Sequence, residues 1–498
     1  MSIERYIFNH AQATPQKTAL ISGKVEVSYE QLWKEIEMAA AWFSEKAERG
    51  DRIIVSASKN IEFVYTYFGA HLARMICVPI DPETNETRLK RIIDVAKPKL
   101  IVGELRNHGE LHVIPFEECH QELENFRIDN DMFPKEEDIA DLLFTTGTTG
   151  LPKGVALTYG NQMAAAENIN TFIGNTADDV EMLALPISHS FGLGRLRCVL
   201  AKGGTLVMLG SFASMKKFFG EMERCRVTGF GMVPASWAYI QKMSGEKIGQ
   251  FAHQLKYIEI GSAFMSLENK QKLMSLLPKT HICMHYGLTE ASRSAFISFH
   301  DDKEHLMSAG KASPNTEIAV FNEEGEMLGK TSDYKFSYSQ PLDFKSNGTD
   351  DGEICVKGEH VCSDYWGMPK EEFNKDFFGD YFRTGDWGHI DDDGYIYLVS
   401  RKKEIINVGG KKVSPIEVEE HLNEIDGIVE SACVGIHDDV LGEVVKAFCV
   451  CSKEVDFEVV KKILFKKIET YKIPVFFEVI QELPKTQNGK IQRLMLKN

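Results

Sequence analysis

A run of small, hydroxyl-bearing and glycine residues in the first third of the chain could hold an anion. Residues 143–155 read LFTTGTTGLPKGV, so threonines and glycines precede a single lysine, Lys153. Glycines let backbone N–H groups approach an anion closely, and threonine hydroxyls add neutral donors, which suits a phosphate-binding loop. A Walker A loop needs a second glycine five residues after the first, and Pro152 stands there instead. The loop alone is equally compatible with an ordinary turn.

Three further stretches present polar residues with definite chemical uses. Glu290 in YGLTE could bind a hard cation, and Asp386 in TGDWG has two acceptor oxygens for hydroxyl groups. Lys490 in PKTQNGK is presented near the chain end by a turn that contains glycine. Taken alone, these residues are better explained as a loop end, a turn aspartate and an exposed lysine.

Short β-branched runs alternate with amphipathic segments through the first half of the chain. Residues 51–58 and 99–105 have the pattern of buried strands, and residues 29–47 have the apolar spacing of a helix. This alternation predicts an α/β fold built from βαβ units around a largely parallel sheet. Further strands are expected at 181–187, 204–209 and 256–261.

The last third of the chain has a different residue pattern. Residues 329–353 are polar without a sustained period, which indicates an exposed excursion, and DDDG at 391–394 predicts a hairpin. From about residue 404 the remaining length suits a small α+β domain with helices near 418–425 and 457–468. We therefore place a boundary at Lys403 and predict two domains, 1–402 and 403–498.

Composition excludes several classes of protein. With 498 residues, 43% of them hydrophobic, the chain can bury more than one core. The formal charge of -16, from 57 basic and 73 acidic residues, works against binding a nucleic acid through the overall field. The ten cysteines are scattered without a CxxC, and no signal peptide or transmembrane run is evident. We expect a cytoplasmic protein with reduced thiols.

Four segments beyond the loop, together with earlier pieces, resemble one family. In order and spacing they are similar to the adenylate-forming superfamily, which includes acyl-CoA synthetases, luciferases and the adenylation domains of peptide synthetases. The resemblance implies a large N-terminal domain of mixed and parallel sheets flanked by helices, with a small β-barrel-like part, and a small mobile α+β C-terminal domain. The segments are 184–193, 285–292, 381–419 and 483–493, and the earlier pieces are 27–32 and 78–102.

The resemblance implies a two-step reaction that uses ATP and Mg²⁺. A carboxylate attacks the α-phosphorus of ATP, pyrophosphate leaves, and a thiol then captures the acyl-adenylate. In-line displacement at phosphorus needs positioning and charge neutralisation more than covalent help. On this resemblance Glu290 and Thr145 ligate Mg²⁺, Thr289 donates to the α-phosphate, and Lys153 adds a cation. The residues that would wrap the β- and γ-phosphates are Thr145, Thr146, Gly147, Thr148, Thr149 and Gly150.

The same resemblance assigns residues that would bind the nucleoside and the acyl group. Asp386 and Arg401 would bind the ribose, Gly261 would receive the adenine, and Tyr286 would stack on it. Lys490 would neutralise carboxylate and α-phosphate charge during adenylation. The remaining assignments are His189 beside the acyl carboxylate, Lys403 as the hinge, and Gly409 and Gly410 in the segment for thioester formation.

The substrate is expected to be a carboxylic acid without an α-amine. Amino-acid-activating relatives commonly carry an aspartate in the motif that reads SHSFGL here, and this chain has none. The apolar residues Phe191, Leu193, Met232, Phe264 and Met265 lie in segments that match the family's acyl pocket, which favours a largely apolar tail. Three arginines in those segments could bind a second polar group, although surface or salt-bridged positions are favoured. They are Arg195, Arg197 and Arg293.

The acceptor thiol stays open between coenzyme A and a separate acyl carrier protein. The chain stops five residues after Arg493 with no carrier domain, so the thiol is expected in trans. Coenzyme A is the favoured acceptor. Luciferase-like oxidation has no support in the sequence. A nucleotide-binding regulator without turnover ranks below the enzyme, because Lys490 and Glu290 are both present.

Overall fold

The computed structural model describes residues 2–106, 108–120, 133–146, 152–331, 348–401, 404–409, 411–485 and 491–497. These residues form two compact units. The first contains the described residues up to 317 together with 356–382, and the second contains the described residues of 318–355 and 383–497. The predicted site residues that lie outside the described residues are Gly147, Thr148, Thr149, Gly150, Lys403, Gly410 and Lys490.

A six-stranded sheet of the first unit carries both strands that flank the phosphate-loop candidate. The strands lie in the order β18-β7-β6-β4-β3-β5, in which β5, β3, β4 and β6 are parallel and β7 and β18 are antiparallel to their neighbours. Helices α3 and α4 contribute to different core clusters on this sheet. Its elements are β3 (Arg52–Ser56), α3 (Ile61–Leu72), β4 (Ile76–Ile80), α4 (Glu86–Ala96), β5 (Leu100–Val102), β6 (Ile139–Thr146), β7 (Pro152–Thr158) and β18 (Asp364–Tyr365).

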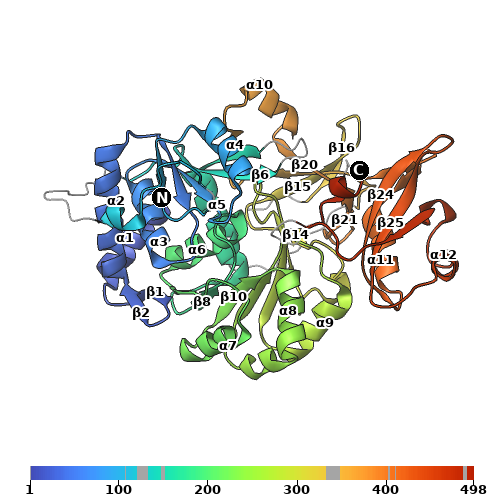
Figure 1. The fold of residues 1–498 in the computed structure, drawn as a ribbon, viewed down its shortest axis with the longest axis horizontal. Helices are drawn as coiled ribbons and strands as arrows, with labels where there is room; N and C mark the ends of the chain where they lie inside the picture. The colour runs from blue at the N-terminus through green and yellow to red at the C-terminus, as the bar shows by residue number, and fades with distance from the viewer. Residues whose placement is uncertain are drawn as a thin grey trace. The chain divides into compact units, whose positions relative to one another are not determined.

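The first unit also contains a nine-stranded sheet (Figure 1). Its order is β14-β13-β12-β11-β10-β8-β9-β1-β2, with a parallel centre from β12 to β1 and antiparallel edges. The strands are β1 (Thr18–Ser22), β2 (Val25–Ser28), β8 (Val180–Leu183), β9 (Thr205–Met208), β10 (Gly229–Met232), β11 (Tyr257–Ile260), β12 (His281–Tyr286), β13 (Ala295–Ser298) and β14 (Lys311–Ala312).

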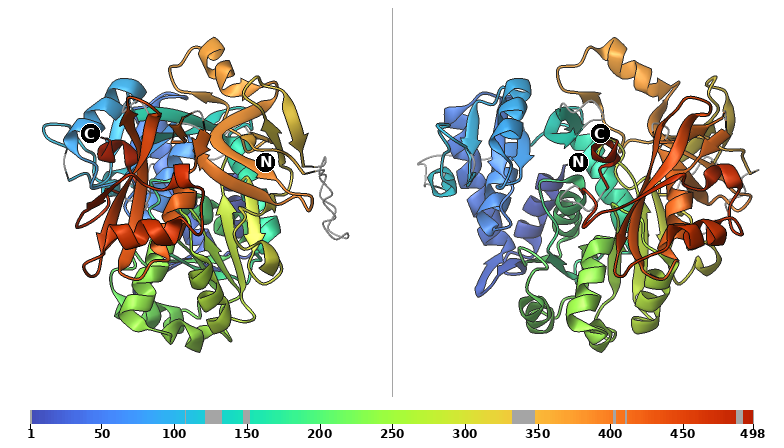
Figure 2. Two further views of the ribbon diagram at one scale, coloured as in Figure 1. Left: turned by 90° about the vertical axis from the view of Figure 1, so that its right-hand side faces the viewer. Right: turned by 45° about the vertical axis from the view of Figure 1, so that its right-hand side comes forward.

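Helices cover the two faces of the nine-stranded sheet with separate cores. On one face Leu183, Tyr257 and Cys283 join a cluster that includes α6, and on the other face Phe230 and Ile258 join a cluster with α7, α8 and α9. Figure 2 shows α7, α8 and α9 in green along one side of this sheet. The helices are α1 (Ile3–Ala13), α2 (Tyr29–Lys46), α5 (Tyr159–Ile173), α6 (Ser190–Lys202), α7 (Met215–Arg224), α8 (Pro234–Ser244), α9 (Leu267–Leu276) and α10 (Lys370–Phe373).

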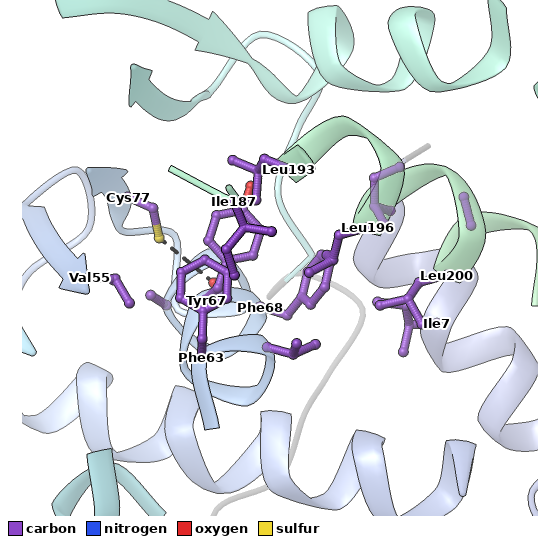
Figure 3. Packing of buried hydrophobic residues seen from close by; sticks show 14 of the residues in the cluster. Ile7, Val55, Phe63, Tyr67, Phe68, Cys77, Ile187, Leu193, Leu196 and Leu200 are labelled. Carbon is purple, nitrogen blue, oxygen red and sulfur yellow. Dashed lines mark hydrogen bonds between the residues drawn. The ribbon is translucent and has the colours of Figure 1, made fainter. Parts of the chain in front are cut away.

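The packing between α3 and α6 joins the two sheets of the first unit. Phe63, Tyr67 and Phe68 of α3 share one buried cluster with Leu193 and Leu196 of α6 (Figure 3). Burying aromatic and leucine side chains stabilises such a contact by about 1.5–3 kcal/mol for each side chain. The position of α6, and therefore of the loop before it, is consequently set by this core.

Local signals explain where the helices begin and end. Ser28 and Gln31 form a reciprocal capping box at the start of α2, and Asn60 caps α3 through the backbone N–H of Phe63. Gly203 ends α6 in the left-handed conformation, with φ +75°. The sequence therefore specifies these boundaries locally.

The second unit contains antiparallel strands followed by a small α+β part. Strands β15 to β17, β20 and β21 belong wholly or mainly to it, and β20 pairs with β21 in a hairpin. The C-terminal sheet has the order β23-β22-β25-β24, with β26 beside β25. The elements are β15 (Glu317–Phe321), β16 (Met327–Lys330), β17 (Gly352–Lys357), β20 (Tyr381–Ile390), β21 (Ile396–Arg401), β22 (Ile406–Val408), β23 (Lys411–Val413), α11 (Pro415–Asn423), β24 (Ile428–Asp438), β25 (Gly442–Cys451), α12 (Phe457–Leu464) and β26 (Phe476–Val479); β19 (Phe377–Phe378) belongs to the first unit.

The predicted fold class is confirmed. Strands occur within all five predicted strand ranges, α2 fills the predicted helix, and the turn at 391–394 closes the β20–β21 hairpin. The strand expected at 181–187 ends earlier, at Leu183. The second compact unit includes strands before residue 402, so it is larger than the predicted small domain. The boundary at Lys403 stays a prediction.

Candidate active site

The phosphate-loop candidate joins two strands that pair up to its edges. In the antiparallel register of β6 and β7, Thr145 lies opposite Lys153 and Thr146 lies opposite Pro152. The five intervening residues lie outside the described residues. Lys153 is therefore held next to the root of the loop by strand pairing.

Tyr365 brings Lys153 and Glu290 to one place. The ammonium nitrogen of Lys153 lies 4.7 Å from the centroid of the Tyr365 ring, and the Tyr365 hydroxyl donates to Oε1 of Glu290 at 2.9 Å. Tyr365 is positioned because β18 pairs with β7, with Tyr365 opposite Val155. A cation and a carboxylate that are distant in sequence thus share one aromatic side chain.

The electrostatics of this cluster favour Tyr365 as a donor. Burial, followed by the charge of Glu290, raises the pKa of the Tyr365 phenol well above its ordinary value. The phenol therefore stays protonated and orients one oxygen of the Glu290 carboxylate. The second oxygen has the hard-donor chemistry that Mg²⁺ prefers, so Glu290 suits a metal ligand.

The turn that carries Thr289 and Glu290 follows the carboxyl end of parallel strand β12. A Cβ atom on Gly287 would lie 2.5 Å from the backbone nitrogen of Arg293, so only glycine fits this close approach. The turn is closed by the backbone N–H of Leu288, which donates to the Ala291 carbonyl at 3.0 Å. Ligands of open α/β sheets bind at such strand ends.

The second unit pairs the two predicted ribose residues. Asp386 and Arg401 lie opposite each other on β20 and β21, and Nε of Arg401 is 2.6 Å from Oδ1 of Asp386. Arg401 also donates to the carbonyl of Thr384 at 3.0 Å. Both partners of the predicted pair are therefore fixed by one hairpin.

The other predicted residues of the first unit lie at strand and helix ends. His189 is the N-cap residue of α6, and its carbonyl accepts from the backbone of Leu193 at 3.0 Å. Tyr286 ends β12, and Gly261 follows β11. These positions are compatible with a site at the carboxyl edge of the sheet.

Gly409 of the second unit has a constrained backbone. It follows β22 with φ +58°, and its N–H donates to the Leu441 carbonyl at 2.8 Å. The left-handed conformation favours glycine at this position.

The three arginines of the predicted pocket segments are buried and paired, so the salt-bridge alternative is confirmed. Arg195 donates to Glu181 at 2.9 Å, and Arg293 donates to Glu259 at 3.1 Å. Arg197 pairs with Asp141 of β6. Their charges are compensated inside the protein.

The five predicted apolar pocket residues do not share one cluster. Met232 and Met265 belong to the cluster with α7, α8 and α9, and Phe264 is 51% exposed. Phe191 and Leu193 lie in the cluster on the opposite face, with α6. Successive residues of a strand point to opposite faces, so residues that are close in sequence can join different clusters. The role of these residues in an acyl pocket stays a prediction.

Sequence reasoning missed Tyr365. The residue lies 75 positions beyond Glu290, within the stretch CSDYWG, where no spacing singles it out. Its role depends on the pairing of a two-residue strand with β7, which is a tertiary contact.

Comparison with known proteins covers both halves of the chain. Residues 7–366 match the AMP-binding enzyme family, and residues 417–490 match the AMP-binding enzyme C-terminal domain. The long-chain-fatty-acid–CoA ligase of Bacillus subtilis (strain 168) is 28% identical over 99% of this chain and 94% of the relative. A 2-succinylbenzoate–CoA ligase of Staphylococcus epidermidis is 26% identical, covering 99% of this chain and 97% of the relative.

Solved structures share the fold over nearly the whole length. The o-succinylbenzoate CoA synthetase of Bacillus subtilis, in complex with its acyl-adenylate intermediate, is 25% identical with a TM-score of 0.84, covering 99% of this chain and 98% of that chain. ATP-bound MatB from Rhodopseudomonas palustris is 24% identical with a TM-score of 0.85, covering 100% and 98%. In the described part of the chain, no helix combines the length and apolar character needed to cross a bilayer. The chain belongs to the AMP-binding enzyme family.

Proposed function

We propose that this protein is an AMP-forming acid–thiol ligase that makes an acyl-CoA from a carboxylic acid, ATP and coenzyme A. The observation that carries the proposal is the convergence of Lys153 and Glu290 on Tyr365 beside the strands that flank the threonine-glycine loop. The curated relatives support it, because the fatty-acid and 2-succinylbenzoate enzymes are both named as CoA ligases.

In the proposed first step, a carboxylate oxygen attacks the α-phosphorus and the bond to the β-phosphate oxygen breaks. Pyrophosphate leaves and the acyl-adenylate remains. Lys153 and the loop residues would hold the phosphates, and Thr289 would donate to the α-phosphate. Mg²⁺ supplies charge neutralisation when bound, and Glu290 with Thr145 would hold it.

In the proposed second step, the thiol sulfur attacks the acyl carbonyl carbon and loses its proton to solvent. The carbon–oxygen bond to AMP then breaks, giving a thioester and AMP. Asp386 and Arg401 would keep the ribose in place during both steps, because a carboxylate can accept from both ribose hydroxyls. His189 would lie beside the acyl carboxylate.

The two steps are proposed to use different arrangements of the C-terminal domain, residues 403–498. Lys490 would serve adenylation, and Lys403 would be the hinge through which the domain presents Gly409 and Gly410 for thioester formation. Lys403→Pro, which restricts φ, is expected to spare adenylation and cripple thioester formation. Lys490→Ala is expected to do the reverse. Equal slowing of both half-reactions by Lys403→Pro would refute the hinge.

Pyrophosphate release over a panel of carboxylic acids tests the activity. The expected result is pyrophosphate and acyl-adenylate without coenzyme A, and pyrophosphate, AMP and a thioester in equal amounts when coenzyme A is present. If ATP binds but no acid gives pyrophosphate, the chain is a nucleotide-binding regulator. A marked preference for a phosphopantetheinylated carrier protein over coenzyme A would show that the carrier protein is the acceptor.

Tyr365→Phe tests the observation that carries the proposal. The variant keeps the ring beside Lys153 but removes the hydroxyl that orients Glu290. Hydrogen bonds to charged groups are worth about 1.5–3 kcal/mol, so kcat/KM for Mg·ATP should fall by about 10- to 100-fold. Tyr239→Phe is the matched control, because Tyr239 donates its exposed hydroxyl to the Ala213 carbonyl.

A further inference from the structure

The face of the nine-stranded sheet that packs against α6 carries charged and titratable side chains. Glu181 of β8, Glu259 of β11 and His285 of β12 lie on this face, where Arg195 of α6 bridges the two carboxylates. Alternation along the strands puts the neighbours of these residues on the opposite face. The interface between α6 and the sheet is therefore polar at its centre.

Four side chains at this interface contact one another in a closed ring, which we call the end wall: Arg293, Glu259, His285 and Phe191. Oε1 of Glu259 accepts from Nε of Arg293 at 3.1 Å and lies 2.7 Å from Nδ1 of His285. The His285 and Phe191 rings meet edge to face with centroids 4.6 Å apart. The Arg293 guanidinium carbon, 4.9 Å from the Phe191 centroid, closes the ring.

The end wall is anchored to the backbone and to a second ion pair. Arg293 donates to the carbonyls of Ser190 and Phe191, both at 2.9 Å. Nη1 of Arg195 lies 3.4 Å from the other oxygen of Glu259. The side chains of Arg293 and Glu259 are at most 2% exposed. Displacing Arg293 or Glu259 would leave buried charge uncompensated, which favours the closed arrangement of this ion pair.

The end wall fills the room that two glycines leave over the sheet. A Cβ atom on Gly261 would lie 2.1 Å from the His285 imidazole. A Cβ atom on Gly231 would lie 2.8 Å from Leu185 and 3.3 Å from the Phe191 ring. An alkyl chain running between α6 and these strands would overlap the same side chains.

The end wall lies close to the residues proposed to act on the α-phosphate. His285 is the penultimate residue of β12, and Thr289 and Glu290 follow within five positions. Four residues span at most about 14 Å even when extended. The tight turn at Gly287 makes the separation shorter than that limit.

Resting on the proposed function, we propose that the end wall restricts this ligase to short aliphatic acids, with His285 as the specificity-determining residue. The carboxylate would be activated beside Thr289, and the tail would end against His285 and Phe191. Acetate, propionate or butyrate leaves the ring of contacts intact. Octanoate would have to open it.

A chain-length series on the full-length protein tests the proposal. Pyrophosphate release is measured with acetate, propionate, butyrate, hexanoate and octanoate at saturating Mg·ATP. We expect kcat/KM to be highest for one of the three shortest acids and to fall by about 10-fold or more for each methylene beyond the limit, the range found for tight apolar pockets. A kcat/KM for octanoate equal to or above that for butyrate would overturn the proposal.

His285→Ala tests whether His285 sets the limit on chain length. Its partner Glu259 keeps Arg293 and Arg195, so the variant leaves no unpaired charge. We expect the octanoate-to-butyrate ratio of kcat/KM to rise by about 10-fold or more. Met284→Ala is the matched control, because the neighbouring side chain packs against the cluster on the other face, and it should leave the ratio unchanged.

The outcomes separate this inference from the proposed function. If no acid of any length gives pyrophosphate while ATP binds, the proposed function itself fails. If pyrophosphate forms but kcat/KM does not change with chain length, only the proposal for the end wall is refuted. The same holds if His285→Ala leaves the octanoate-to-butyrate ratio unchanged. His285→Asn, which keeps a planar polar group, provides a second variant, and a ratio of two acids on one preparation is insensitive to partial unfolding.

Discussion

Two buried histidines of the first unit have opposite electrostatic environments. The ring nitrogens of His71 lie 2.9 Å from Glu4 and 3.0 Å from Asp141. Burial alone would lower the pKa of His71, but Cys77, Asp141 and Glu4 raise it well above its ordinary value. This histidine is therefore held as a cation within the core between α1, α3 and β6.

His285 has one carboxylate, and that carboxylate is shared with two arginines. Burial lowers the pKa of His285, and the effect of Glu259 in the opposite direction is reduced by Arg293 and Arg195. The imidazole stays neutral near neutral pH. Both rings are buried, so the difference in charge follows from the balance of carboxylates and arginines around each ring: two carboxylates and one arginine at His71, and one carboxylate and two arginines at His285. Only the neutral histidine lies near the proposed acid site.

The largest expected effect is the loss of the shared carboxylate of the His71 cluster. Asp141 accepts from Tyr67 and Gln162, each at 2.9 Å, and it pairs with both Arg197 and His71. Asp141→Asn would leave two buried cations with one carboxylate. Breaking a buried pair in this way costs about 3–5 kcal/mol, which should appear as a lower urea midpoint of unfolding.

The control for that measurement is a carboxylate of the same type at the surface. Asp138→Asn removes a partner of Arg49, whose side chain is 52% exposed, and should cost at most about 1 kcal/mol. Equal shifts of the midpoint for Asp141→Asn and Asp138→Asn would contradict the role assigned to the buried cluster.

A smaller loss of stability is expected for Glu259→Gln. Arg293 keeps its two carbonyl acceptors and Arg195 keeps Glu181, so the remaining charges stay partly compensated. A cost of about 1–3 kcal/mol is expected from the lost charged hydrogen bonds. A lower urea midpoint for Glu259→Gln than for Asp141→Asn would contradict this difference between the His71 and His285 clusters.

The charge of His71 predicts how stability depends on alkaline pH. Because the folded pKa is raised above 6.5, the contribution of His71 is fully present below pH 6.5 and is lost as pH rises through the folded pKa. The slope is at most about 1.4 kcal/mol per pH unit. The stability difference between wild type and His71→Gln should shrink as pH rises, and a difference independent of pH would show that His71 is neutral.

The smallest effect, with the opposite sign, is expected for His285. Its folded pKa is lowered below 6.5, so the neutral folded form loses stability relative to the unfolded chain as pH falls below 6.5. Unfolding midpoints of wild type and His285→Gln, measured from pH 7 downward, should converge. Divergence on acidification would mean that the wall histidine is protonated in the folded protein.

Local structure could be predicted because it depends on neighbouring residues. The apolar spacing of 29–47 and the turn signal at 391–394 are local, and the structure has a helix and a hairpin turn there. The role of the threonine-glycine loop stays a prediction, since five of its residues lie outside the described residues. One hairpin brings Asp386 and Arg401 together, and their binding of the ribose stays a prediction.

Several strand ranges, the helix at 29–47 and the motifs of the family could be identified from the amino-acid sequence, because each depends on residues that are close together along the chain. Contacts between side chains far apart in the sequence, such as Tyr365 with Glu290 and Arg293 with Glu259, depend on tertiary packing. It also decided that Met232 faces α7, α8 and α9 while Gly231 faces α6. Alternation along a strand divides residues between two faces, but the helix that covers each face is chosen by packing of the whole core.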